Sequence, residues 1–156
     1  MGARKDEGEK IVATNRKARH DYELLERFET GIMLTGDEVK SLRAGRASLV
    51  DAFARVYGGE IWLEGMHIPP YEQGDKRTQL PVRPRKLLLH RREIESIARD
   101  LAEKGLSLVP LRVYFTHGMA KVEVALARGK RRYEKRQSIA KREAQREMQR
   151  AAGRRR

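Results

Sequence analysis

Two runs of residues that meet at Gly58-Gly59 constrain the fold of this chain more than any other stretch. In DAFARVY, small apolar residues (Ala52, Ala54, Val56) alternate with larger ones (Phe53, Arg55, Tyr57), and in EIWLE Ile61 and Leu63 alternate with Trp62 and Glu64. This two-residue period is typical of a strand with one buried face. A pair of glycines between two such runs is typical of a tight turn. The sequence therefore predicts a β-hairpin here.

A second hairpin is predicted in LSLVPLRVYFTHGMAKVEVALARG, with its turn at His117-Gly118 and with Pro110 at an edge or a bulge. Its expected inward positions are Val113, Phe115, Val122, Val124 and Leu126. Earlier in the chain we expect strands near 20–28 and 31–35, separated by a turn or bulge at Gly31.

Two helices interrupt the strands. TGDEVKSLRAG has Thr35 or Asp37 as a capping residue at its start, Val39 and Leu42 three residues apart, and Gly45 at its end, which predicts a short helix. An apolar run, Leu87 to Leu89, precedes a longer helix that ends at Gly105. The proline-rich segment 69–85 is expected to be a surface loop.

About six short strands without β-α-β alternation argue against a parallel nucleotide-binding sheet. The fold that we predict is a mainly β, six-stranded antiparallel closed barrel, similar to the oligonucleotide-binding barrels, with flanking helices. The expected organisation is a flexible N-terminus at 1–10, a barrel at 11–129, and a basic C-terminal tail at 130–156.

The last stretch, 128–156, carries most of the positive charge. Its thirteen Lys and Arg residues and three Glu residues give +10 of the formal net charge of +13. It has too few apolar residues to form a core, so we expect it to be disordered when free. Basic residues recur at every fourth position at Arg142, Arg146, Arg150 and Arg154, so a polyanion that neutralised them would favour a helix.

Two interpretations of this tail stay open. It can be a solvated charge run that aids solubility, or an arm that binds phosphates with a steep dependence on salt. Tyr133, which lies among basic residues in GKRRYEKR, favours the second interpretation because an aromatic side chain can stack on an unpaired base. The tail lacks the aromatic and leucine face of a membrane-surface helix, so nucleic acid is the better partner.

Catalytic and metal sites are not indicated. The chain has no cysteine, and its four histidines occur singly, outside any motif of a metalloprotease, a hydrolase or a nucleotide-binding loop. The N-terminus has no apolar signal segment, and we expect a cytoplasmic protein without a cofactor.

Basic clusters in NRKARHDY and RPRKLLLHRR have two interpretations. Either cluster alone is typical of an ordinary solvated surface. Together on one barrel they favour binding of a structured RNA through its phosphates and shape.

Several blocks of the chain resemble the small protein B family, which binds transfer-messenger RNA (tmRNA). These blocks are NRKARHDY, ETGIMLTGDEVKSLRAG, GGEIWLEGMHIPPYEQG, RKLLLHRREI and VPLRVYFTHGMAKVEVALARGKRRYEKR, and the resemblance spans roughly residues 11–150. The resemblance implies a six-stranded barrel that binds the tRNA-like domain of tmRNA one-to-one. It also implies delivery of the alanylated RNA to stalled ribosomes, where the tail folds as a helix in the empty mRNA channel.

The resemblance further implies two sets of site residues. The tmRNA-binding face is expected to contain Asn15, Lys17, His20, Tyr22, Glu29, Arg85, Lys86, Leu88 and Lys121. The segment that reaches the decoding centre and mRNA channel of the small ribosomal subunit is expected to contain Lys130, Arg131, Tyr133, Lys135, Arg136, Arg142, Arg146 and Arg150.

Two other classes of function remain as alternatives. A structural ribosomal protein would thread its tail through ribosomal RNA and would be present in every ribosome. A nuclease that used His20 would need converging carboxylates and a divalent metal ion.

Overall fold

The computed structural model describes residues 9–75, 77, 79–130 and 142–151. Its strands are β1 (Lys10–Thr14), β2 (Tyr22–Ile32), β3 (Phe53–Tyr57), β4 (Glu60–Glu64), β5 (Arg85–Leu88), β6 (Ser107–Thr116) and β7 (Met119–Gly129). Its helices are α1 (Arg16–Asp21), α2 (Gly36–Arg43) and α3 (Arg91–Lys104), and residues 142–151 are also helical.

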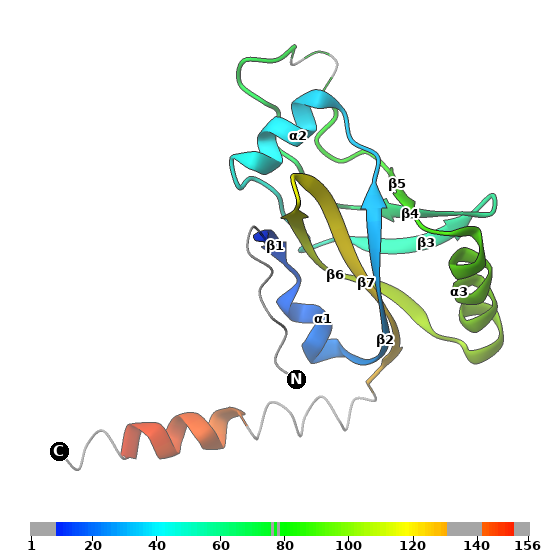
Figure 1. Ribbon diagram of the computed structural model, residues 1–156. Helices are drawn as coiled ribbons and strands as arrows, with labels where there is room; N and C mark the ends of the chain where they lie inside the picture. The colour runs from blue at the N-terminus through cyan, green and yellow to red at the C-terminus, as the bar shows by residue number, and fades with distance from the viewer. Residues whose placement is uncertain (1–8, 76, 78, 131–141, 152–156) are drawn as a thin grey trace.

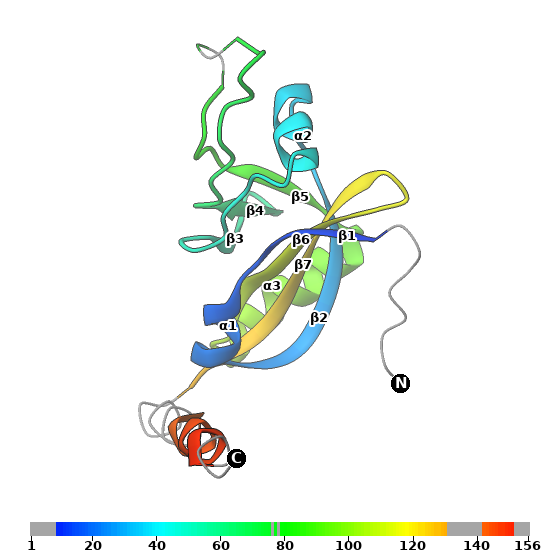
Figure 2. The same ribbon diagram turned by 90° about the vertical axis from the view of Figure 1, so that its left-hand side faces the viewer.

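The strands form one antiparallel sheet in the order β1-β6-β3-β4-β5-β2-β7, and β7 pairs back onto β6. That last pairing closes six of the strands into a ring, so the predicted barrel is confirmed. β1 lies outside the ring, on β6. Figures 1 and 2 show α2 at one end of the barrel, with α1 and α3 against different sides near the other end.

The predicted hairpins are both present. β3 and β4 pair from Phe53↔Glu64 to Tyr57↔Glu60, and the turn glycines Gly58 and Gly59 have φ of 61° and 75°, which L side chains rarely adopt. β6 and β7 meet at His117-Gly118, and their register shifts beside Pro110, at the predicted bulge.

The predicted short helix is α2, and it begins with a reciprocal cap. The Glu38 N–H donates to Thr35 Oγ1 at 3.3 Å, while the Thr35 N–H donates to Glu38 Oε1 at 2.9 Å. α3 ends at Gly105, whose φ of 61° is the left-handed conformation of a helix C-terminus.

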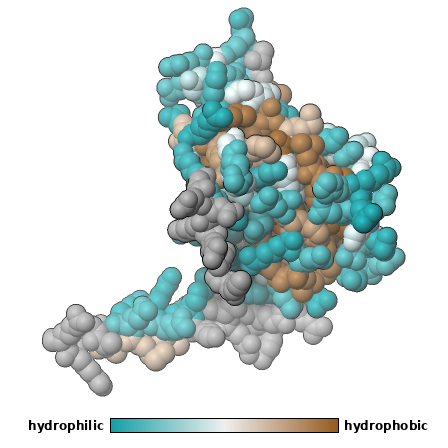
Figure 3. Space-filling model, viewed as in Figure 1, coloured by the Kyte–Doolittle hydropathy of each residue, from teal (hydrophilic) through white to brown (hydrophobic). Residues whose placement is uncertain are grey.

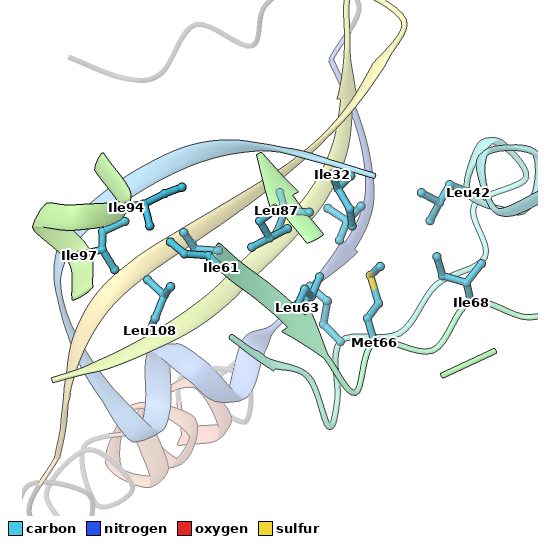
Figure 4. Packing of buried hydrophobic residues seen from close by; sticks show 14 of the residues in the cluster. Ile32, Leu42, Ile61, Leu63, Met66, Ile68, Leu87, Ile94, Ile97 and Leu108 are labelled. Carbon is cyan, nitrogen blue, oxygen red and sulfur yellow. The ribbon is translucent and has the colours of Figure 1, made fainter. Parts of the chain in front are cut away.

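The core fills the barrel and extends under α2 and α3 (Figure 4). β4 and β5 contribute Ile61, Leu63 and Leu87, all completely buried, and α3 covers them with Ile94 and Ile97. Each such side chain stabilises the fold by about 1.5–3 kcal/mol relative to an exposed one. The predicted inward residues of the second hairpin all belong to this core.

Three elements near the N-terminus differ from the expectation. β1 includes Lys10, and Arg16–Asp21 form α1 rather than a lead-in to a strand. β2 is continuous through Gly31, with its irregularity between Leu24 and Glu26. The pairing of β1 with β6, and of β2 with both β5 and β7 around Gly31, explains the extent of β1 and the continuity of β2. α1 has a local cause instead, because the Asn15 side chain caps it by accepting the Ala18 N–H at 3.2 Å.

Candidate nucleic-acid interface

Three of the predicted RNA-binding residues meet in one groove on the outside of the barrel. The groove has a volume of about 650 Å³. It is lined by Arg27, Phe28, Glu29, Gly31, Leu88, Leu89, His90, Glu93 and Lys121. Glu29, Leu88 and Lys121 come from three different strands, and we call this site the Glu29 groove.

Strand register explains why these residues converge. Gly31 of β2 pairs with Leu88 of β5 on one side and with Lys121 of β7 on the other. A Cβ atom at Gly31 would lie only 3.2 Å from Leu88 Cβ, so glycine permits this close approach. Leu88 keeps 47% of its surface exposed. Figure 3 shows that, on the face seen in Figure 1, exposed hydrophobic residues (brown) are bordered by hydrophilic ones (teal).

A buried tyrosine holds the carboxylate of the groove. The Tyr114 hydroxyl donates a hydrogen bond to Glu29 Oε2, although the two residues are 85 positions apart in the sequence. Burial, followed by the bond to Glu29, raises the pKa of Tyr114 well above its usual value, so the hydroxyl remains a donor. The Arg112 guanidinium lies over the Tyr114 ring, 4.0 Å from its centre, and makes a cation–π contact with it.

A second group of predicted residues lines a smaller hollow of about 230 Å³. The predicted residues in it are Asn15, Lys17 and Tyr22. The other residues of its lining are Ala18, Asp21, Val50, Asp51, Ala52, Phe53 and Val109. The Asn15 amide donates to Pro110 O at 2.9 Å while its oxygen accepts the Ala18 N–H at 3.2 Å, so Asn15 builds the wall of this hollow. Lys17 is exposed.

His20 lies beside this hollow in a partly buried position. Its Nδ1 is 2.8 Å from Asp21 Oδ1, and among the described residues its buried Nε2 has no hydrogen-bond partner. Lys86 lies on the outer side of β5, 3.5 Å from Glu60 Oε1. The structure therefore distributes the predicted face over more than one hollow.

Arg85 does not reach the surface, and this corrects its predicted role as a direct RNA contact. Its side chain is 0% exposed. It donates to Met66 O at 2.8 Å, to Pro81 O at 3.1 Å and to the Glu38 carboxylate. These partners satisfy a buried guanidinium, which would otherwise be strongly unfavourable in the interior.

Glu38 joins α2 to the long loop before β5. Its carboxylate accepts hydrogen bonds from both Arg83 and Arg85. Burial by itself would raise the pKa of Glu38, but hydrogen bonds from Arg83, Thr35 and Arg85 outweigh it and hold that pKa below its ordinary value. We call these three side chains, Glu38, Arg83 and Arg85, the buried ion cluster.

The described part of the tail consists of Lys130, which is partly buried, and the exposed residues 142–151. The Lys130 N–H donates to Asp21 O at 2.9 Å, and Lys130 Nζ donates to Arg19 O at 3.3 Å, so the tail leaves the barrel beside α1. Arg142, Arg146 and Arg150 lie in the helix at 142–151, where every residue is exposed. Arg131, Tyr133, Lys135 and Arg136 lie outside the described residues.

Within the described ranges, no group of three or more His, Cys, Asp or Glu side chains is arranged to hold a metal ion. No helix in the same ranges is long and apolar enough to cross a membrane.

The comparison with protein families decides what this barrel is. The model of the SmpB protein family matches residues 12–154. The chain belongs to the SmpB family. An SsrA-binding protein of Salinispora arenicola (strain CNS-205) is 61% identical over 151 residues, which cover 97% of this chain and 95% of that relative. One from Desulforudis audaxviator (strain MP104C) is 60% identical over 146 residues, covering 94% and 95%.

A solved structure supports the same assignment. It is described as "tmRNA-SmpB: a journey to the center of the bacterial ribosome". Its chain is 49% identical, superposes with a TM-score of 0.64, and covers 81% of this chain and 92% of its own. The ring of strands described above is therefore the fold of that SmpB structure.

Sequence patterns missed several residues of these sites. Arg27 and His90 line the Glu29 groove, Phe53 and Val50 line the smaller hollow, and Tyr114 holds Glu29. The sequence of β6 could have indicated the position of Tyr114. Because Val113 and Phe115 belong to the barrel core, the residue between them must lie on the outer face of the strand, the face that also carries Glu29 on β2.

Proposed function

We propose that this SmpB-family protein binds the tRNA-like domain of tmRNA with its barrel and delivers that RNA to stalled ribosomes. It then acts in trans-translation, in which the ribosome is released and the nascent peptide is tagged for degradation. The function is that of an RNA-binding adaptor in the cytoplasm, one protein per RNA, without a catalytic step.

The observation that carries this proposal is the convergence of Glu29, Leu88 and Lys121 in one groove. The groove offers a hydrogen-bond acceptor, an apolar platform and a cation side by side. Those are the groups that recognise an unpaired base and its backbone in a folded RNA. The names of the relatives, which are SsrA-binding proteins, supply the identity of the RNA.

The tail has a separate role in this proposal. Its basic residues, Arg142, Arg146 and Arg150 among them, neutralise ribosomal RNA phosphates while the segment around Tyr133 enters the decoding centre. The expected helix in the mRNA channel would present these arginines on one face. In this proposal the barrel selects the RNA, and the tail binds in the mRNA channel only when no message occupies it.

A titration of the full chain against tmRNA and an ordinary tRNA, each at two salt concentrations, tests the proposal. We expect tight binding of tmRNA that survives the higher salt, and weak binding of tRNA that does not. Equal, salt-sensitive binding of both RNAs would contradict the proposed selectivity of the barrel.

The division between barrel and tail has its own test. The combined change Tyr133→Ala, Lys135→Ala and Arg136→Ala is expected to leave tmRNA affinity nearly intact while peptide tagging on stalled ribosomes is lost. The matched control is Leu88→Ala, which should weaken RNA binding directly. If the tail variant lost RNA affinity as fully as that control, the division would be wrong.

A further inference from the structure

The Glu29 groove contains a feature that phosphate binding does not explain. A carboxylate repels phosphates, yet Glu29 lies in the groove between the cationic residues Arg27 and Lys121. No ion pair of Glu29 or Lys121 occurs among the described residues, whereas Arg27 lies 3.7 Å from Glu123 Oε1. The carboxylate is therefore available to a ligand as an acceptor.

Tyr114 orients that acceptor. Its hydroxyl occupies one lone pair of Glu29 Oε2, and the ring is 1% exposed and stacked against Arg112, so the hydroxyl has little freedom to move. Each carboxylate oxygen accepts more than one hydrogen bond. Oε1 and the second lone pair of Oε2 remain for two donors that approach side by side.

Only one unmodified RNA base presents two such donors. Guanine carries N1–H and the 2-amino group next to each other on its Watson–Crick edge. Cytosine and adenine place a ring nitrogen acceptor beside their amino group, and uracil flanks N3–H with two carbonyl oxygens. Each of those acceptors would face a carboxylate oxygen, which is also an acceptor, so the contact would be unfavourable.

The rest of the groove fits a base that is turned out of its stack. Leu88, backed closely by Gly31, provides an exposed apolar surface for the face of the base. Lys121 and Arg27 line the same groove and can neutralise the adjoining phosphates.

From these contacts we propose that the Glu29 groove takes one unpaired guanine, which donates N1–H and its 2-amino group to the Glu29 carboxylate, with Tyr114 as the residue that positions that carboxylate. The inference rests on the proposed function, because it names the base that the groove selects within the bound RNA.

Replacing guanine with inosine tests the guanine assignment, since inosine keeps N1–H and lacks the 2-amino group. The probe is the tRNA-like domain of tmRNA, with each unpaired guanine replaced in turn by inosine and titrated with the full chain. Removal of a hydrogen bond to a charged group predicts that inosine at one position weakens binding by roughly 10-fold or more. The other positions should change it little.

A double-mutant cycle with Glu29→Gln assigns that loss to the groove. In the Glu29→Gln protein the same inosine should cause almost no additional loss. Additive losses, or no sensitive guanine at all, would overturn the guanine assignment. In either case tight, selective binding of unmodified tmRNA would leave the proposed function standing, and its absence would remove that function instead.

Tyr114→Phe provides the test of positioning. This variant keeps the aromatic packing and removes only the hydroxyl, so we expect a loss of several-fold with the guanine-containing RNA and almost none with the inosine RNA. Far-ultraviolet circular dichroism and thermal unfolding verify that the fold is kept. An equal loss for both RNAs would show that Tyr114 acts through the fold alone and would overturn its assigned role.

Discussion

Glu29 on strand β2 and Glu38 in helix α2 are two carboxylates with opposite surroundings. Glu38 is 7% exposed, and its oxygens are occupied by Arg83, Arg85 and the start of α2. Glu29 is exposed and has one tyrosine hydroxyl as its partner among the described residues. The comparison shows that a carboxylate surrounded by protein partners supports the fold, whereas one held from a single side remains open to a ligand.

A similar contrast separates Arg85 from Lys86, two basic residues that are adjacent in the sequence. Arg85 precedes Lys86 in a basic segment, yet Arg85 faces the buried ion cluster and Lys86 faces outward. Neighbouring residues of a strand point to opposite faces, so a basic run on a strand cannot all contact one RNA.

The largest expected effect is on stability in the buried ion cluster. Glu38→Ala leaves a fully buried guanidinium, that of Arg85, without its carboxylate, and we expect the free energy of unfolding to fall by about 3–5 kcal/mol. Urea denaturation measures it. The matched control is Glu29→Gln, for which we expect a change within about 0.5 kcal/mol. Similar losses for the two variants would break the contrast between the regions.

Leu88→Ala should weaken RNA binding while it changes the stability of the fold little. Leu88 is 47% exposed in the free protein, and in the proposed complex a base covers it. We therefore expect its truncation to remove about 1.5 kcal/mol of apolar burial, which is roughly a 10-fold loss of tmRNA affinity. Filter binding with tmRNA measures this loss. A variant that bound RNA normally would remove Leu88 from the interface.

Lys121→Ala is expected to have a smaller effect of a different kind. The loss of one phosphate contact should weaken tmRNA and non-cognate RNA alike, and should reduce the slope of log affinity against log salt by about 1. Titrations at several salt concentrations check this. An unchanged slope with altered selectivity would instead place Lys121 on a base.

The smallest expected effect is the pH dependence of the buried ion cluster. The pKa of Glu38 is below the value of 4.5 that this side chain has when unperturbed. Its stabilising contribution is therefore complete above pH 4.5 and is lost as the pH falls through the lower, folded-state pKa. The difference in unfolding free energy between the wild type and Glu38→Gln should shrink over that range. A difference that stayed constant or grew would show that Glu38 is not ionised in the cluster.

Local patterns in the sequence predicted much of the barrel. The Gly58-Gly59 turn, the Thr35 cap of α2 and the bulge beside Pro110 all involve residues that are close in the chain. Short-range hydrogen bonds and permitted backbone angles suffice for such elements, so the pattern carries the information. The resemblance to known blocks then supplied the residues of the proposed RNA-binding face.

The sequence by itself determined the hairpins, the helix caps, the excess of positive charge in the tail and membership of the SmpB family. Tertiary structure alone decided that β1 joins β6, that Arg85 is buried, and that Tyr114 aligns Glu29 from 85 residues away. The physical reason is the range of the interactions. Pairing between distant strands sets which face each side chain occupies, and no local pattern specifies which distant group it will meet there.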